Sequence, residues 1–418
     1  MLSIHYQSIP IMNKLAYALL TCIVILSLST SCEKDSIRVP VQTIELSASS
    51  FTLATDSVRI VVAQLSPNNT TDTNITWTSS NQQVAIVDQS GNVKGISPGT
   101  TVISATSPDG KISASCEVDV IQWTLHKGGL GFVEEGINAM ALDKEGNIWI
   151  CGQNVIKLGS QGAWLMNNSN LNPSAITFDN QGFAWIGTGS GLYRYDGSKW
   201  EVFTTENSGL KDNSIITLAT DNTGRVIASH FNRESLLGTG ASEFDGNSWK
   251  YYSSANGLVY DNVISMAIDK SGVRWFVTTN GISSFDGEKW NSYGASNVGV
   301  AHIGLVHSVA VDSNNNKWFG TNSGLIKFDG TKWESFTNQN SGIIGGSVTA
   351  IAFDNNKNLW VATGAGLAHF DGVKWKVFDR YNHPVQDIRT ILTTPDGKIY
   401  IGTGLGLLIA SLRDSSLG

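Results

Sequence analysis

The sequence predicts an all-β protein whose larger part is built from repeats, and three observations support this fold class. Glycine accounts for 43 of the 418 residues and only 15% of the residues are charged, a composition that favours short strands and tight turns over long helices. From residue 41 onward, short apolar stretches alternate with turn residues. A tryptophan also recurs about every 42 residues, an interval typical of a four-stranded repeat. The recurring tryptophans are Trp123, Trp164, Trp200, Trp249, Trp290, Trp333 and Trp375.

The amino-terminal segment is typical of an export signal. A short basic region begins at Met12, and residues 15–28 form an apolar run that is too short to span a membrane. We therefore expect residues 1–31 to be a signal peptide, with Met12 as an alternative start.

Cys32 is the expected lipid anchor. Residues 28–32 resemble a lipobox, which implies that Cys32 is lipidated, that residues 32–40 are a lipidated linker, and that the membrane is a partner through this anchor. The charged residues that follow resemble the leader of Bacteroidetes surface lipoproteins. This resemblance implies an exported outer membrane lipoprotein that faces either the cell surface or the periplasm. Ordinary secretion with cleavage near Ser31 is the alternative.

Residues 41–121 are expected to form a first domain of short strands. Three apolar stretches are strand candidates, at residues 60–63, 84–87 and 102–105. Further motifs occur in order at residues 76–81, 84–88, 91–95 and 98–101. Together these motifs resemble a bacterial Ig-like domain of group 2, which implies a small Ig-like β-sandwich that acts as a spacer or as a binding module. We expect Trp77 to fill its core, with a carbohydrate platform as the alternative.

The rest of the chain repeats four sequence markers in constant order. One is the recurring tryptophan. The others are an Asp-x-x-Gly turn, as at Asp143, a second-strand motif, as at Trp149, and an aromatic-Asp-Gly turn, as at Tyr195. Four markers in constant order predict four strands per unit, which is the architecture of a β-propeller blade.

The first and last units predict how the ring closes. Trp123 begins a fourth-type strand before any first strand has occurred, while the last unit, residues 385–411, has no such strand. We therefore expect the Trp123 strand to complete the last blade as a Velcro closure. The expected ring is a seven-bladed β-propeller over residues 122–412, with a tail at residues 413–418. Six or eight blades are the alternatives, because one unit is short and another carries an insertion.

The repeat units resemble the two-component regulator propeller repeat. The resemblance rests on residues 320–325, 328–330 and Trp333, and it covers residues 123–412. Members of that family form the sensor regions of hybrid histidine kinases, so the resemblance implies a propeller that recognises polysaccharide fragments. The sequence contains no later apolar stretch that could span a membrane and no kinase domain, so we expect recognition without signalling by this chain itself.

Charge and cysteine content restrict the partners. The net charge is −7 and no basic stripe occurs, which argues against nucleic acid as a partner. Cys116 and Cys151 fall in apolar strand patterns of different domains, so we expect buried free thiols rather than a disulfide or a metal site. We expect no cofactor, no metal and a monomer.

One irregular loop is the best clue to a binding site. Residues 230–240 replace a short turn of the third unit, on the face where the loops of a propeller gather around its channel. Polar and aromatic residues of this insertion and of neighbouring loops, together with His307 and Arg389 at matching positions of two first strands, form the expected ligand-binding set. The set is His230, Asn232, Arg233, Glu234, Tyr260, Asp261, His302, His307, Arg380, Tyr381, His383 and Arg389. The alternative is that each is a solvated loop residue or a buried group satisfied by the backbone.

Three functions remain open from the sequence. The first is a non-enzymatic cell-surface or periplasmic lipoprotein that recognises a polysaccharide fragment or a protein through the loop face of its propeller. The second is a structural or adhesive display scaffold without a small ligand. The third is a polysaccharide-degrading enzyme such as a lyase. The sequence contains no HExxH or Gly-x-Ser-x-Gly motif, so no catalytic residue is assigned. A lyase would have to combine His230, Arg233, Tyr381 and His383.

Overall fold

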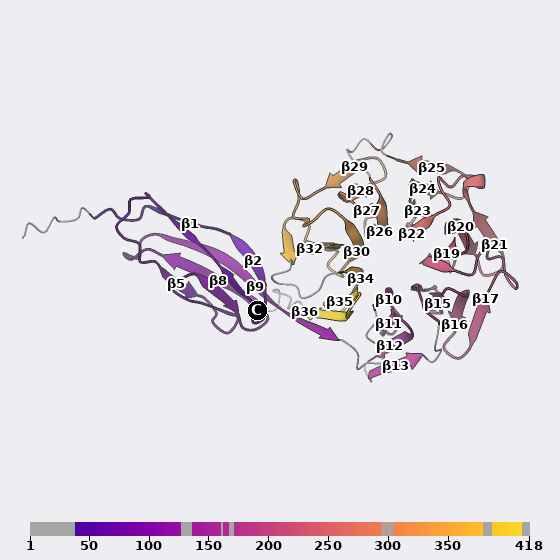
Figure 1. The fold of residues 1–418 in the computed structure, drawn as a ribbon, viewed down its shortest axis with the longest axis horizontal. Coiled ribbons are helices and arrows are strands. Elements are labelled where there is room, and N and C mark those ends of the chain that lie inside the picture. The colour runs from indigo at the N-terminus through magenta and orange to yellow at the C-terminus, as the bar shows by residue number, and fades with distance from the viewer. Residues whose placement is uncertain are drawn as a thin grey trace, which may run out of the picture.

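The computed structural model describes residues 38–126, 136–159, 162–166, 171–294, 298, 304–378 and 387–411. These residues form a small β-sandwich and a ring of sheets that lie side by side (Figure 1). Strands account for all the regular structure of the described residues except a single 3-10 turn, η1 (Ser254–Asn256). The predicted all-β class, with a sandwich before a propeller, is therefore confirmed.

The sandwich is built from eight short strands and the first half of a long one. The strands are β1 (Thr43–Leu46), β2 (Ser50–Ala54), β3 (Val58–Ile60), β4 (Ala63–Ser66), β5 (Thr76–Ser79), β6 (Ala85–Val87), β7 (Asn92–Gly95), β8 (Gly99–Thr106) and β9 (Ser113–His126). They pair as β1–β4, as β3–β7–β6 and as β5–β8–β9–β2. Trp77 is 6% exposed and packs in one cluster with Leu53 and Val118, which confirms its expected place in the core.

Six four-stranded antiparallel sheets follow, and we number them as blades 1 to 6. Blade 1 has β10 (Ala139–Leu142), β11 (Ile148–Cys151), β12 (Val155–Gly159) and β13 (Gly162–Met166), and blade 2 has β14 (Ala175–Phe178), β15 (Ala184–Gly187), β16 (Leu192–Tyr195) and β17 (Trp200–Phe203). Blade 3 has β18 (Ile215–Thr220), β19 (Val226–Asn232), β20 (Leu237–Phe244) and β21 (Trp249–Tyr252). Blade 4 has β22 (Val263–Ile268), β23 (Arg274–Thr278), β24 (Gly281–Phe285) and β25 (Trp290–Tyr293). Blade 5 has β26 (Val306–Val311), β27 (Lys317–Thr321), β28 (Gly324–Phe328) and β29 (Trp333–Phe336), and blade 6 has β30 (Val348–Phe353), β31 (Leu359–Thr363), β32 (Gly366–Phe370) and β33 (Trp375–Phe378).

A seventh unit closes the ring with a strand from the other end of the chain. Its strands β34 (Ile388–Thr393), β35 (Lys398–Thr403) and β36 (Gly406–Ser411) are completed by β9, in which Trp123 pairs with Ala410. The first strands contact one another in a closed circle, from β10 through β14, β18, β22, β26 and β30 to β34 and back to β10. The described strands thus form seven four-stranded units, closed by the Trp123 strand as expected.

A buried hydrogen bond recurs where the first strand of a blade turns into the second. In five blades the indole Nε1 of the second-strand tryptophan donates to the aspartate that opens this turn, at 2.8 to 3.3 Å. The pairs are Trp149–Asp143, Trp185–Asp179, Trp275–Asp269, Trp318–Asp312 and Trp360–Asp354. A buried indole N–H needs an acceptor, so these aspartates serve packing.

The antiparallel strands define two faces of the ring. The pairing of Ile215 with His230 places the loop before a first strand beside the turn between the second and third strands. We call this side the loop face. The opposite side carries the turns between first and second strands and between third and fourth strands, and we call it the turn face. The glycine-rich stretches of the loop face are tight turns, since Thr321 Oγ1 donates to the carbonyl of Gly324 at 3.0 Å and Thr403 Oγ1 to that of Gly406 at 2.9 Å.

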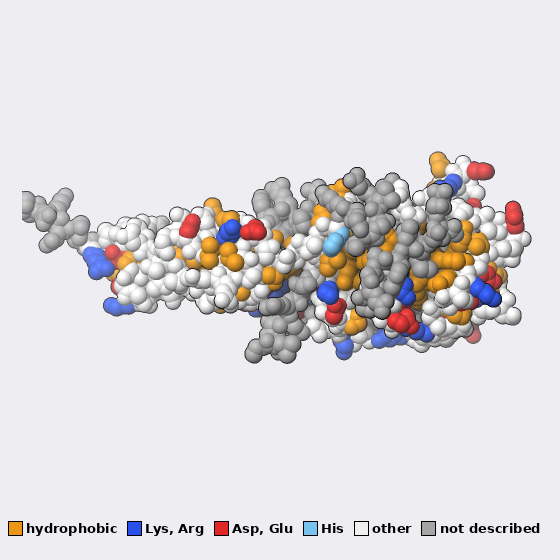
Figure 2. Space-filling model, turned by 90° about the horizontal axis from the view of Figure 1, so that it is seen from below, with side chains coloured by type: hydrophobic (Ala, Val, Ile, Leu, Met, Phe, Trp, Pro, Cys, Tyr) orange, Lys and Arg blue, Asp and Glu red, His pale blue; other side chains and the backbone are white. Residues whose placement is uncertain are grey.

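The sandwich is joined firmly to the rim of the ring. Strand β9 runs without a break from β8 of the sandwich to β36 of the propeller. Ile121 of this strand packs in one buried cluster with Trp360 and Phe378, and Lys376 Nζ lies 2.6 Å from Asp119 Oδ2. Seen edge-on, the sandwich continues outward from the rim and covers neither face of the ring (Figure 2). Both faces are therefore open to partners on the sandwich side.

Candidate functional site

A ring of side chains surrounds the channel at the loop face. Each side chain belongs to the residue directly after the buried residue that begins or leads into the first strand of its blade. They are Asn138, Ser174, Ile216, Ile264, His307, Thr349 and Arg389. Ser174 Oγ donates to the carbonyl of Ile215 at 2.6 Å, and Thr349 Oγ1 donates to that of Ile388 at 3.0 Å. These bonds tie one blade to the next, so part of this ring is structural.

Arg389 and His307 are the members of this ring that can offer a charge. Arg389 Nη2 lies 3.0 Å from Asp387 Oδ2, and its Nη1 donates to Asn138 Oδ1 at 3.4 Å. The Arg389 side chain is 42% exposed, while His307 is half-buried. Both residues thus lie where a first strand begins on the loop face, and the Arg389 guanidinium already contacts Asp387 and Asn138.

The insertion of blade 3 is an extended hairpin formed by β19 and β20. Asn232 caps its turn, accepting from the amides of Glu234 and Ser235 and donating to Asp212 Oδ2 at 3.0 Å. Arg233 Nε donates to Ser214 Oγ at 3.1 Å. Its guanidinium lies over Gly189 of blade 2, where a Cβ atom would come within 2.7 Å of Nη2. Arg233 thus bridges two blades on the loop face.

The same hairpin rests on the loop that enters blade 4. The amide of Gly240 donates to the carbonyl of Asp261 at 2.8 Å, and a Cβ atom at Gly238 would come within 2.2 Å of Asn262 Cα. The Asp261 carboxylate accepts from the Ser254 amide and hydroxyl, so it is occupied locally. Tyr260 beside it is 43% exposed. The hairpin therefore packs on Asp261 and Asn262, the two residues that follow the exposed Tyr260.

His230 differs from the expectation of an exposed loop residue. It lies within β19 opposite a bulge, is 0% exposed, and packs against the ring of Tyr251 with centroids 6.4 Å apart. Neither ring nitrogen has a hydrogen-bond partner. The inserted residues lengthen the two strands instead of forming an open loop, and this lengthening buries the imidazole. His230 therefore cannot touch a ligand in this structure.

The burial of His230 predicts a pH-dependent stability. Burial lowers the pKa of His230 to about 4, whereas an unfolded histidine titrates near its ordinary pKa of about 6.5. As the pH falls below 6.5, the unfolded chain binds the proton first, so the folded state loses stability down to about pH 4. We expect this loss to reach about 3 kcal/mol. Urea unfolding of the wild type and of His230→Leu between pH 7.5 and 4 measures it. Parallel curves for the two proteins would contradict the assignment.

Four of the expected residues lie outside the described residues: His302, Arg380, Tyr381 and His383. Cys32 also lies outside them, and its lipidation stays a prediction. Across the described ranges, no three His, Cys, Asp or Glu side chains are grouped as metal ligands. Nor does this part of the chain contain a helix with the length and apolarity to cross a membrane. Cys116 and Cys151 are buried free thiols, as expected.

Exposed apolar side chains gather on the loop face. The described propeller exposes six large apolar residues, and five of them lie in loops or turns of this face. They are Leu236 (70%), Leu237 (57%), Tyr260 (43%), Leu305 (52%) and Leu405 (54%). Val373, the sixth, is 82% exposed on the turn face. The loop face thus combines apolar area with the charges of Arg233, Glu234 and Arg389.

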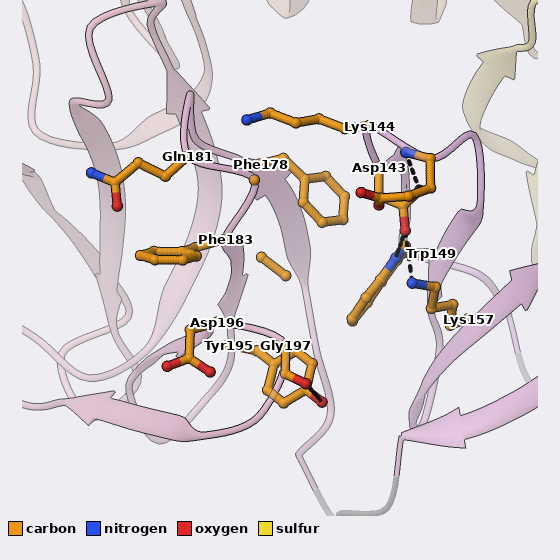
Figure 3. A pocket seen from close by; sticks show the side chains of 13 residues that line it. Asp143, Lys144, Trp149, Lys157, Phe178, Gln181, Phe183, Tyr195, Asp196 and Gly197 are labelled. Atoms are coloured by element: carbon orange, nitrogen blue, oxygen red, sulfur yellow. Dashed lines mark hydrogen bonds and ion pairs between the residues drawn. The ribbon is translucent and has the colours of Figure 1, made fainter.

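Two hollows lie away from the loop face. One, of 440 Å³, lies between blades 1 and 2 (Figure 3). The other, of 600 Å³, lies between the sandwich and blades 6 and 7. In the second, Lys376 pairs with Asp119 and Lys398 pairs with Asp396 at 2.7 Å, so its lysines are already paired within the protein. Sequence reasoning did not expect either hollow.

The fold and its loops define a β-propeller protein that carries one Ig-like domain, and family models agree with this description. Residues 40–118 match the bacterial Ig-like domain (group 2), and residues 342–365 match the two component regulator propeller. The chain therefore contains a bacterial Ig-like domain of group 2, and blade 6 of its propeller contains a segment that matches the two component regulator propeller. Both resemblances found in the sequence are confirmed.

Individual relatives cover only parts of the chain or share only the fold. The extracellular domain of a hybrid two component system from B. thetaiotaomicron is 16% identical with a TM-score of 0.59, over 80% of this chain and 48% of that chain. A streptogramin B lyase is 12% identical with a TM-score of 0.53, over 70% of this chain and 98% of that chain. These identities show a shared fold alone. A 3-O-alpha-D-galactosyl-alpha-L-arabinofuranosidase from Bifidobacterium longum subsp. longum is 46% identical over 61 residues, which is 14% of this chain and 5% of that enzyme. The chain thus spans a small fraction of this curated relative and about half of that extracellular domain.

Proposed function

We propose that this protein recognises a protein partner through the loop face of its propeller. The observation that carries the proposal is that five of the six large apolar side chains exposed on the described part of the propeller lie on this face. Exposed apolar area accompanied by polar groups marks interaction sites. Export directed by residues 15–28 would place this face outside the cytoplasm.

Leucine side chains favour a protein over a polysaccharide at this face. Leu236 and Leu237 form the tip of the hairpin and offer apolar area without hydrogen-bonding edges. Sugar hydroxyls placed against them would lose water without gaining partners, which costs free energy. A protein partner can cover them with its own apolar side chains, while Arg233 and Glu234 lie at the rim of the contact.

The test compares a double substitution on the loop face with a single substitution on the turn face. Proximity labelling on intact cells identifies the partner, and titration calorimetry with the purified partner measures its affinity for each variant. We expect Leu236→Ser/Leu237→Ser to weaken binding at least about tenfold, because exposed apolar anchors dominate such interfaces. Val373→Ser, an equally exposed change on the turn face, should leave binding unchanged. Equal affinities of wild type and the hairpin variant, or the lack of any partner, would refute the proposal.

The two other functions have less support. A display scaffold without a ligand would leave the apolar side chains of the loop face without a role. A lyase that uses His230 as a catalytic group is disfavoured. His230 is 0% exposed, so neither solvent nor substrate can reach it. Arg233, another candidate group for a lyase, contacts both blade 2 and blade 3 and so has a structural role.

A further inference from the structure

The hollow between blades 1 and 2 belongs to the turn face. Its rim comes from the first-to-second turns of both blades and from the third-to-fourth turn of blade 2. The hollow has a volume of 440 Å³. It lies on the opposite face of the ring from the hairpin tip, so a ligand here would not compete with a partner on the loop face.

A single small residue explains why this groove is open. Ala184 begins the second strand of blade 2, where it pairs with Phe178. The pairing registers place larger residues at the same position in the later blades: Val226, Arg274, Lys317, Leu359 and Ile399.

Two of these larger residues show where the missing side chain would go. Lys317 reaches back to the preceding blade, where its Nζ lies 3.6 Å from Asp269 Oδ2 and 5.3 Å from the centroid of the Trp275 ring. Arg274 reaches Glu243 in the same way, at 2.8 Å. A methyl group cannot fill this space, so the groove between blades 1 and 2 stays hollow.

The walls of the groove are aromatic and held in place. Figure 3 shows Phe178, Phe183 and Tyr195 around one side of the hollow and Trp149 with Lys157 across from them. Tyr195 packs against Trp200 with the rings tilted and their centroids 4.8 Å apart, and its hydroxyl donates to the carbonyl of Gly197 at 2.7 Å.

The other two rings of this wall have fixed neighbours as well. Phe178 meets the edge of Trp149 at 5.5 Å, and the guanidinium of Arg194 lies 5.5 Å from the centroid of Phe183. Phe178, Phe183 and Tyr195 are each half-buried. Ring surface that stays partly exposed is therefore preorganised for a ligand.

The lining of the groove carries three carboxylates and two lysines: Asp143, Glu145, Asp196, Lys144 and Lys157. Lys157 Nζ lies 2.9 Å from Asp143 Oδ2 at the base. Burial opposes ionisation of Asp143, yet hydrogen bonds from Trp149, Asn147 and Lys157 hold its pKa below the ordinary value. Asp143 is thus a charged and fully engaged partner of Lys157. At the rim, Lys144, Gln181 and Asp196 offer further donors and acceptors.

We propose that this groove binds a neutral pyranose ring of a saccharide. A pyranose has apolar C–H faces that fit against aromatic rings and a rim of hydroxyls that need donors and acceptors, which is the pattern of this groove. A neutral ring suits a site in which Lys157 is already paired with Asp143 and carboxylates outnumber lysines, since an anionic sugar would be repelled. A peptide would fit less well, because β12, β15 and β16 are paired on both sides and offer its backbone no strand edge.

The test uses a panel of methyl pyranosides with the full chain and saturation-transfer difference NMR. We expect at least one neutral methyl pyranoside to bind the wild type. Ala184→Leu should reduce its affinity at least about tenfold. The new side chain fills the groove as Leu359 does between blades 5 and 6, so the fold should be retained. Phe183→Ala, which removes one aromatic wall without adding bulk, should weaken binding as well.

Two controls separate this site from the loop face. Val373→Ala, on the same turn face, should leave sugar binding unchanged, and so should Leu236→Ser/Leu237→Ser. The proposal is overturned if no neutral pyranoside binds, if Ala184→Leu and Phe183→Ala bind as the wild type does, or if a peptide occupies the groove instead. A result of this kind leaves the proposed protein recognition at the loop face standing, because the two sites share no residue.

Discussion

A chain that begins at residue 136, without the closing strand, is expected to lose its cooperative fold, whereas a chain that begins at residue 121 keeps it. Removing β9 leaves residues 407–411 of β36 without partners on one edge, while the pairing with β35 on the other edge remains. It also removes Ile121, Trp123 and Leu125 from the cluster between blades 6 and 7. A fully buried apolar side chain contributes roughly 1.5–3 kcal/mol, so the loss is on the order of 5 kcal/mol.

The exposed edge adds aggregation to this loss. An unpaired strand edge is a template for pairing with other chains, so the shorter chain should elute as aggregates. Size-exclusion chromatography and thermal melting of the two chains check the prediction. A monomeric chain from residue 136 with the melting temperature of the longer one would show that the ring needs no closing strand.

Substituting one partner of the buried ion pair between blades 3 and 4 should be the most damaging point change in the ring. Arg274 donates to both carboxylate oxygens of Glu243, at 2.8 and 2.9 Å, and the hydroxyl of Tyr252 donates to the same carboxylate at 3.0 Å. Glu243 and Arg274 are 5% and 6% exposed. Breaking such a pair leaves an uncompensated buried charge, so we expect Glu243→Ala to cost about 3–5 kcal/mol.

The double variant Glu243→Leu/Arg274→Leu separates charge from packing. Replacing both partners by apolar residues of similar size is often close to neutral, so the double change should recover most of the loss. Glu201→Gln, which breaks the solvent-exposed pair with Arg194, is the matched control and should cost less than about 1 kcal/mol. Urea unfolding followed by tryptophan fluorescence measures all three. A double variant as unstable as Glu243→Ala would mean that the pair is needed for packing and not for charge balance.

The fold could be predicted from the sequence because its determinants repeat. The Asp-x-x-Gly turns and the second-strand tryptophans recur together, and the structure shows that they are bonded to each other, as Asp143 is to Trp149. The closing strand was also predictable, because Trp123 stood without preceding strands. A pattern that occurs in every unit is set by local packing, and local packing can be recognised in sequence.

The candidate site could be predicted only in part, because sites depend on departures from the repeat. The insertion at residues 230–240 was visible as extra length, but not the fact that it lengthens β19 and buries His230. The groove between blades 1 and 2 could not be recognised in the sequence, because Trp149 and Tyr195 of its walls belong to motifs that recur through the ring. Its one signal is Ala184, a small residue at a position where the later blades have larger ones. That position becomes comparable between blades only once the strand registers are known.

The unbroken strand β9 also has a mechanical consequence. A force applied to the sandwich and resisted at the propeller would be transmitted along the backbone of β9 into its ladder with β36. That ladder would be loaded in shear, with its hydrogen bonds sharing the force rather than opening one after another. The Ile121 cluster and the Lys376–Asp119 pair resist swivelling at the same junction. Under such a load the sandwich would move together with the ring, so the tilt of both faces would follow the position of its far end.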